Sequence, residues 1–230
     1  MDHFRDLQMR GLAQGYYPEP TKSILVVAER NVTRAKEYFR GMGIQVVTGS
    51  RYLGGFVGER EAEASWIQEK VDGWAESVRT LAGVARKHPQ SIYAGLQKSL
   101  QHECTFVQRV TPGIGDAFGP VEEEIATAFL PEFFKGVGDG APGRAIARLS
   151  VKQAGLALPD PMWAAPDNWQ ASCIIIGHLV LLLRGQVTFR TADHAACLRD
   201  ERAAVRLKSV AKAMASLEAT IAGDPEEVSC

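Results

Sequence analysis

The sequence predicts an α+β fold that is mostly α-helical, with a small sheet near the N-terminus followed by a bundle of several helices. Three observations carry this prediction. Residues 23–28 (SILVVA) form a continuous apolar, β-branched run. Two further short β-like segments follow at residues 45–48 and 51–57. From about residue 59 onward, apolar residues recur at steps of three and four, which is the period of an α-helix.

The composition is that of an ordinary globular protein. The chain has 230 residues, of which 46% are hydrophobic and 23% are charged, so it is long enough to bury a real core. Its 26 basic and 27 acidic residues nearly cancel. Autonomous nucleic-acid binders are usually basic, so the balance argues mildly against tight independent binding. A nearly neutral chain can still carry a local basic patch.

The sequence predicts an intracellular protein, in the cytoplasm or nucleus, that is not secreted and has no membrane partner. The four cysteines show no CxxC spacing, and residues 1–15 lack the apolar core of a signal peptide. The longest apolar stretch, residues 171–183, is interrupted by Gly177 and His178. It is shorter than the roughly 18 residues that suggest a membrane span.

The N-terminal elements are expected in the order loop, strand, helix and hairpin. Residues 23–28 should be a buried strand, and Asn31 should cap a helix that runs to about Met42. Residues 45–48 and 51–57 should then pair as two strands. Gly49-Ser50 between them fits a two-residue hairpin turn with glycine first.

The helical part contains five apolar stripes. The first is expected to end at Pro89 and the second at the loop of residues 111–115 (TPGIG). Pro131 should bend or end the third, and the glycine-rich residues 136–143 should be mobile. Residues 144–169 contain three prolines and are expected to be irregular. Residues 169–183 should form a helix that is central to the core, because they are apolar nearly all round. The stripes are Ile67, Val71, Trp74, Val78, Leu81, Ala85; Tyr93, Leu96, Leu100, Cys104, Val107; Phe118, Val121, Ile125, Phe129; residues 169–183; and Ala203, Leu207, Val210, Met214, Leu217, Ile221.

Several familiar kinds of active site are not favoured by the sequence. GYYPEPTKSILVV (residues 15–27) ends in a Lys-Ser pair but lacks the spacing of a P-loop, and its strand follows the loop rather than preceding it. On one helix, His102 and Cys104 would point in different directions, so they do not predict a nucleophile and base. No histidine has a second one three or four residues away, so His178 is expected to be a core residue and no metal site is predicted.

Two basic stripes are candidate phosphate contacts. Arg144, Arg148 and Lys152 recur every four residues and would share a face if that segment were helical. The second stripe consists of Arg199, Arg202 and Arg206. For each stripe the alternative, a solvated charged face, is the more common outcome.

Four motifs in order resemble reverse transcriptases of eukaryotic, non-LTR-type retroelements, over about residues 15–185. GYYPEPTKSILVV and then GSRYLGGFVG resemble the end of the palm domain, and FLPEFFKG resembles a helical segment beyond it. RLSVKQAGLALPDP with NWQASCIIIGHLV resembles a region that the family commonly writes R-L-P-V-x-x-G-G-L-G-L-x-x-P. Here Ser150 stands where proline is usual, and Ala154 and Ala157 stand where glycine is usual.

The resemblance implies roles for particular residues. Lys22 matches a motif lysine near the phosphates of the incoming nucleotide, as an accessory charge or proton donor. Tyr52, Leu53, Gly54 and Gly55 match the primer grip, which holds the primer backbone. Without the resemblance, Lys22 would be a solvated loop lysine and the two glycines would mark a bulge.

The family's catalytic aspartates lie upstream of the first motif, and we expect this chain to start too late to contain them. No adjacent Asp-Asp pair occurs in the 230 residues. The two carboxylates bind Mg²⁺ in the intact family enzyme, so no cofactor is expected on this chain and the chain alone is predicted to be inactive as an RNA-directed DNA polymerase, a nucleotidyltransferase.

The resulting hypothesis is a C-terminal reverse transcriptase fragment. It would comprise a partial palm (residues 1–58), a helical thumb and extension (residues 59–185) and a C-terminal helical tail (residues 186–230). Its partners would be an RNA/DNA template–primer duplex and the missing N-terminal part of the polymerase. The alternative is a non-enzymatic helical protein that binds nucleic acid or another chain. An open edge at the strand of residues 23–28, with exposed apolar area around it, would favour the first hypothesis.

Overall fold

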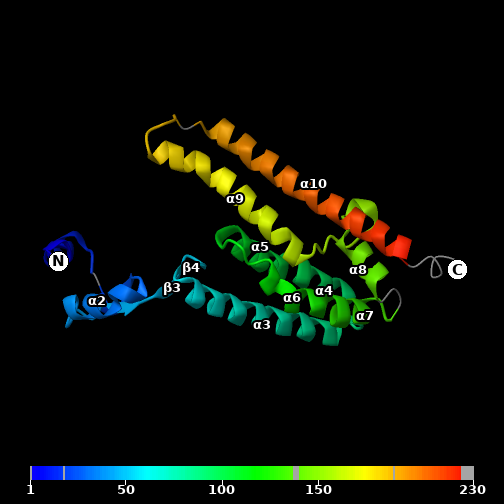
Figure 1. The fold of residues 1–230 in the computed structure, drawn as a ribbon, viewed down its shortest axis with the longest axis horizontal. Helices are drawn as coiled ribbons and strands as arrows, with labels where there is room; N and C mark the ends of the chain where they lie inside the picture. The colour runs from blue at the N-terminus through cyan, green and yellow to red at the C-terminus, as the bar shows by residue number, and fades with distance from the viewer. Residues whose placement is uncertain (1, 18, 137–139, 189, 224–230) are drawn as a thin grey trace. The chain divides into compact units, whose positions relative to one another are not determined.

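The computed structural model describes residues 2–17, 19–136, 140–188 and 190–223. The chain forms two compact units, unit 1 (Met1–Trp66) and unit 2 (Ile67–Cys230). The predicted class, α+β and mostly helical, is confirmed (Figure 1). The division falls inside helix α3 rather than after residue 58, and residues 190–223 belong to the same unit as the helices that precede them. Short 3₁₀ turns cover Leu12–Gln14, Pro20–Lys22, Glu29–Asn31, Asp116–Phe118 and Val151–Gln153.

Unit 1 contains a parallel strand pair connected by a helix. Helix α1 (Asp2–Gly11) is followed by β1 (Ile24–Val26), α2 (Val32–Tyr38) and β2 (Gln45–Val47). β1 and β2 pair in parallel, with Ile24 opposite Gln45 and Val26 opposite Val47. The strand and the helix lie where the sequence predicts them, but the helix ends at Tyr38 rather than near Met42. The prediction that the strand is buried is wrong, because Ile24 is exposed and the other two residues of β1 are only partly covered. Asn31 makes no side-chain capping bond and instead ends a 3₁₀ turn.

The hairpin has a different turn from the predicted one. β3 (Gly49–Tyr52) pairs antiparallel with β4 (Gly55–Gly58), and the two turn residues are Leu53 and Gly54. The prediction of a Gly49-Ser50 turn is wrong, because those residues lie inside β3 and β2 pairs with β1 instead. The physical reason lies at Gly49, where a Cβ atom would come within 2.5 Å of the Phe56 ring. Glycine is needed there for cross-strand packing, not for a turn.

The hairpin is anchored to the first turns of α3 (Arg60–Ala85). The Phe56 ring stacks on Trp66, with ring centroids 5.5 Å apart. The Glu59 carboxylate accepts a bond of 2.7 Å from the Glu29 backbone, and the Glu59 N–H donates to the Thr48 carbonyl at 3.0 Å. One end of the hairpin is therefore held in place, while its tip is exposed.

Unit 2 buries the apolar stripes that the sequence predicts for its first helices. The rings of Trp74 and Phe118 stack 5.8 Å apart, and Phe118 and Phe129 are fully buried. The third helix does not end at Pro131, where the sequence predicts a bend or an end, but continues through one more helical turn. A π-helical turn precedes α5 and another precedes α7. The elements are α3, α4 (Pro89–Gly95), the π turn Leu96–Leu100, α5 (Gln101–Val110), α6 (Gly119–Glu124), the π turn Ile125–Phe129 and α7 (Leu130–Phe133).

The prediction that residues 144–169 are irregular is wrong for the two ends of this range, which belong to helices, and holds for residues 149–160 apart from one 3₁₀ turn. The two helices are α8 (Ala141–Arg148) and the first part of α9 (Pro161–Leu183). Proline at the first position of α9 and the Asp160 side chain that caps it are typical of a helix start. Proline content was therefore a poor guide here, because Pro161 and Pro166 lie within α9. Of the segment 136–143, predicted to be mobile, residues 137–139 lie outside the described residues.

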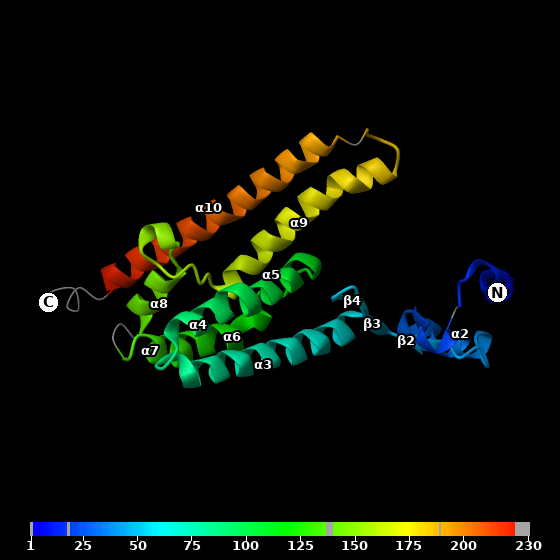
Figure 2. The same ribbon diagram turned by 180° about the vertical axis from the view of Figure 1, so that it is seen from behind.

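The last two helices lie side by side and run in opposite directions. Both views show α9 beside α10 (Thr191–Gly223), which also contacts α8 (Figure 2). The prediction that residues 169–183 are central to the core is wrong for their second half. Ile174, Ile176 and Leu183 are exposed, because that half packs mainly against α10 alone. None of the described helices combines the length and the apolar character needed to cross a membrane.

Candidate functional site

Lys22 lies in a 3₁₀ turn directly before β1. Its side chain is 79% exposed, and its ammonium group lies 2.7 Å from the Glu19 carboxylate. The backbone carbonyl of Thr21 accepts a bond of 3.3 Å from the Gln45 side chain, which ties this turn to β2. The lysine therefore lies near the start of a strand pair, exposed to solvent and paired with Glu19.

The four primer-grip-like residues form the tip of the hairpin. Tyr52 is 67% exposed and Leu53 is 81% exposed, whereas Gly55 is buried opposite Tyr52. Leu53 and Gly54 have φ angles of 48° and 84°, so both turn residues are left-handed. Asparagine and glycine favour this type of turn, and leucine is strained in it. The tip therefore combines a strained backbone with two large exposed side chains.

Arg144 is buried rather than exposed to phosphate. Its side chain is 5% exposed and its guanidinium donates two bonds to the Glu122 carboxylate, of 2.7 and 2.6 Å. A third bond of 2.7 Å goes to the Leu158 carbonyl. These acceptors occupy N–H groups of the guanidinium, so Arg144 could bind a phosphate only if these hydrogen bonds were broken.

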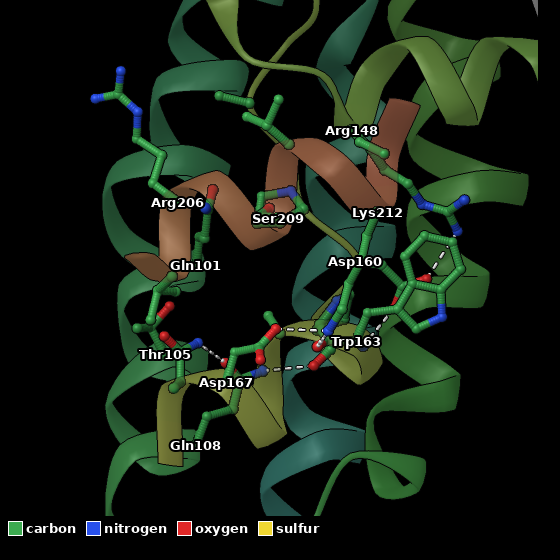
Figure 3. A pocket seen from close by; sticks show the side chains of 18 of the residues that line it. Gln101, Thr105, Gln108, Arg148, Asp160, Trp163, Asp167, Arg206, Ser209 and Lys212 are labelled. Atoms are coloured by element: carbon green, nitrogen blue, oxygen red, sulfur yellow. Dashed lines mark hydrogen bonds and ion pairs between the residues drawn. The ribbon is translucent and has the colours of Figure 1, made fainter. Parts of the chain in front are cut away.

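Arg148 extends this arrangement into a cluster of four charged residues, here called the arginine cluster: Glu122, Arg144, Arg148 and Asp160. Arg148 donates to Glu122 at 2.7 Å. It also donates to Asp160 at 2.9 Å and lies 4.3 Å from the centre of the Trp163 ring (Figure 3). Asp160 also accepts the backbone N–H of Met162 at 2.9 Å. The cluster therefore joins α6, α8 and the start of α9.

Electrostatics within the arginine cluster act on Asp160. Burial and the neighbouring Glu122 carboxylate raise the pKa of Asp160, while Arg148 and the two backbone donors of α9 oppose the change. Two arginines face two carboxylates, so the group is formally neutral when both acids are ionised. Such a cluster fixes the geometry of its helices and leaves little charge for a ligand.

The third predicted phosphate contact, Lys152, is separate from the two arginines. It lies in the 3₁₀ turn Val151–Gln153 and is exposed, whereas α8 ends at Arg148. The three residues therefore do not share one helical face. Of the second basic stripe, Arg199, Arg202 and Arg206 are all exposed on α10.

The other candidates for chemistry have structural roles. Cys104 is buried, and burial raises the pKa of its thiol to about 12, so it is not a nucleophile at neutral pH. Glu103 accepts a bond of 3.1 Å from the Trp74 indole. The ring of His178 stacks on that of His194, 6.3 Å between centroids. Among the described residues, no three His, Cys, Asp or Glu side chains are grouped so as to hold a metal ion.

The segment between α8 and α9 has an unusual backbone. Ala154 and Ala157 have φ angles of 63° and 50°, in the left-handed region that favours glycine. Gly155 between them is buried, and a Cβ atom there would come within 2.3 Å of the Leu149 carbonyl. The segment therefore requires glycine-like conformations at both alanines.

Comparison with known proteins gives no relative: no protein-family model, curated protein or solved structure matches this chain. The arginine cluster was not predicted from the sequence. The sequence held one clue to this cluster: Arg144 and Arg148 are four residues apart and alternate with small or apolar residues, as on a half-buried helix. In the structure the neighbouring Ala145, Ala147 and Leu149 are buried. Glu122, the partner, is too distant in sequence to be identified by spacing.

Proposed function

We propose that this chain is a C-terminal portion of a retroelement reverse transcriptase. It keeps parts that contact the template–primer duplex, and it does not itself supply the catalytic aspartates. In the intact enzyme Mg²⁺ would be bound by those aspartates on the missing N-terminal polymerase part. The proposal places the chain inside the cell, in the cytoplasm or nucleus.

The observation that carries the proposal is the open sheet of unit 1. In the described part of the chain, β1 and β2 pair only with each other, so each has one free edge. Ile24 is exposed, and Leu25 and Val26 are only partly covered. Parallel strands normally lie in larger sheets that are covered on both faces, and two strands alone are marginal in water. Further palm strands supplied by the polymerase part would complete such a sheet.

Two features of the backbone also support the proposal. The exposed tip formed by Tyr52 and Leu53 fits a primer grip, since an aromatic face and a close glycine backbone suit contact with a nucleic-acid strand. Ala154 and Ala157 adopt conformations that favour glycine, the residue that the family tends to have at these positions. The backbone geometry of this segment is therefore compatible with the family motif.

Binding to a labelled RNA–DNA hybrid tests the nucleic-acid contact. We expect Tyr52→Ala to weaken binding about tenfold, because an aromatic side chain that stacks on a base or sugar is lost. Tyr38→Ala is the matched control, since Tyr38 is similarly exposed in unit 1 but lies on α2. Fluorescence anisotropy at about 50 and 200 mM salt would measure both variants. Equal affinities for the two variants would remove the hairpin from the proposed interface.

Phosphate contacts are tested with the exposed lysines. Lys22→Ala and Lys152→Ala should each reduce the dependence of binding on salt concentration, since each removes one cation. Arg144→Ala is not a suitable test, because it would leave Glu122 buried without its main partner. Unchanged salt dependence in both lysine variants would count against phosphate contacts at these positions.

Primer extension tests the absence of a catalytic centre. With Mg²⁺ or Mn²⁺ and all four nucleotides, the isolated chain should extend a primer no faster than background. Extension above background by the purified chain would overturn this part of the proposal.

A helical interaction protein is the second candidate, and the surface of α10 favours it. Leu207, Met214 and Ile221 are exposed at seven-residue intervals on this helix. Such spacing suits a partner helix. If the chain binds no duplex but self-associates, and Leu207→Ser abolishes the self-association in sedimentation analysis, the second candidate replaces the first.

A further inference from the structure

A cavity of about 320 Å³ lies within unit 2, between α5, α9 and α10. Figure 3 shows Gln101 and Thr105 on one wall, Asp167 and Lys212 across from them, and Ser209 on α10. The volume is at the lower end of the range found for small-molecule sites. The cavity takes no part in the nucleic-acid contacts proposed above.

Much of the wall is apolar, and its acids are already neutralised. Apolar lining comes from residues such as Ala164, Val205 and Ala213. The Asp167 carboxylate is held by Lys212 at 2.6 Å and by Lys208 at 3.4 Å. Asp160 is held by Arg148 within the arginine cluster. A ligand therefore meets a wall that favours an apolar body and has no uncompensated carboxylate.

The rim carries uncompensated positive charge. Arg202 and Arg206 line the cavity from α10, and neither forms an ion pair with another described residue. Both are exposed, and Arg206 extends outward from the other lining residues in Figure 3. Their guanidinium groups are free to turn toward an anion at the mouth. The mouth of the cavity therefore carries positive charge, whereas the arginine cluster beside it is formally neutral.

Two side-chain polar atoms of residues that line the cavity have no hydrogen-bond partner among the described residues. The side-chain oxygen of Gln101 is buried and accepts no hydrogen bond from any described residue. The Nε atom of Arg148 is buried and donates none within the same part of the chain. Buried polar groups without a partner are uncommon, because burial removes their hydrogen bonds to water and no other hydrogen bond replaces them. Here one is an acceptor and the other a donor.

We propose that this cavity binds a small amphipathic anion: an apolar, aromatic or aliphatic body that carries one carboxylate-like group and one hydrogen-bond donor. The body lies against the apolar wall and the anionic group faces Arg202 and Arg206. The donor binds the Gln101 oxygen. The inference does not rest on the reverse transcriptase proposal, because it uses none of the same residues in the same role.

Titration calorimetry with matched probes tests the class of ligand. Naphthoate should bind the full chain with a dissociation constant of about 100 µM or tighter, as its size and charge allow. A hydroxynaphthoate should bind more tightly because it adds the donor for Gln101. Naphthylmethylammonium, with the same body and the opposite charge, should bind at least about tenfold more weakly. Equal affinity for the anion and the cation would overturn the proposal.

Variants locate the site. Ser209→Phe should abolish binding by filling the cavity, while Ala211→Phe, on an exposed face of α10, should not. The double change Arg202→Gln with Arg206→Gln should weaken naphthoate binding about fivefold, and Arg199→Gln should leave it unchanged. The arginine changes are at exposed positions, so they test the site even if Ser209→Phe unfolds the chain. Unchanged binding in the double variant would place the anion elsewhere.

Discussion

The two units differ in how much of their structure they stabilise by themselves. Unit 2 packs long helices around fully buried side chains such as Phe118, Phe129 and Val78. In the described part of unit 1, the buried apolar side chains are Ala35 and Trp66, and no strand exceeds four residues. A segment with so little buried area depends on additional contacts for stability. Regular local backbone structure therefore forms in unit 1 although few of its described side chains are buried.

Removal of a large core side chain should give the largest difference in stability loss between the two units. Phe129→Ala should lower the free energy of unfolding by about 3–5 kcal/mol, because it loses a buried ring that stacks on Phe133 at 5.5 Å. Tyr38→Ala, at an exposed position of unit 1, should change it by less than about 0.5 kcal/mol. Urea titration followed by circular dichroism would measure both. Similar losses in the two variants would contradict the assignment of the core to unit 2.

Loss of the shared carboxylate of the arginine cluster should have the next largest effect. Glu122→Gln should destabilise unit 2 by about 3 kcal/mol, because Arg144 and Arg148 remain buried with less negative charge. The adjacent, exposed Glu123→Gln is the control and should have little effect. Thermal unfolding would compare the two. If Glu122→Gln were as stable as the control, the buried pairs would contribute little to the fold.

Glycine at the two strained alanines should stabilise unit 2. Ala154→Gly and Ala157→Gly should each raise the free energy of unfolding by about 0.5–1 kcal/mol, because relief of the left-handed strain exceeds the added entropy of the unfolded chain. Ala203→Gly, on the exposed face of α10, should have the opposite sign. Chemical denaturation of the three variants would measure the effect. A loss of stability at 154 and 157 would show that the alanines are not strained.

The smallest effect concerns pH. Because folding raises the pKa of Asp160, the folded chain holds that proton more tightly than the unfolded chain does. Its contribution to stability is therefore full below about pH 4, the usual pKa of aspartate, and decreases as pH rises through the folded value. Asp160→Asn lacks this dependence and can still cap α9. The stability of the native chain relative to the variant should fall with rising pH in denaturation experiments, and a rise would contradict the sign.

The sequence predicted elements where periodicity decides the structure. The stripe from Ile67 to Ala85 identified α3, because a long amphipathic pattern leaves few alternatives. It did not predict the hairpin turn, since Gly49 looked like a turn residue and Leu53 did not. Leucine rarely adopts a positive φ angle, so the sequence gives no sign that Leu53 is a turn residue. Its position in the turn follows only from the pairing of β3 with β4.

The candidate site residues followed from motifs only in part. Motifs proposed the hairpin tip and Lys22 as contacts, and these remain proposals, whereas the roles of the arginines depended on burial. Spacing placed Arg144 and Arg148 on one face, and it could not show that Glu122 lies against that face. The cavity involves α5, α9 and α10, which are distant in sequence, so no local pattern points to it.

One carboxylate, that of Asp160, joins the start of α9 to the end of α8. It accepts both the Met162 amide and the Arg148 guanidinium, while the Leu158 amide donates to the Ala147 carbonyl at 3.1 Å. If the end of α8 or the start of α9 unfolds, the hydrogen bonds to the Asp160 carboxylate at that end are broken. In deuterium exchange, the amides of the last turn of α8 and the first turn of α9 should therefore open together, as one cooperative unit with a single protection factor.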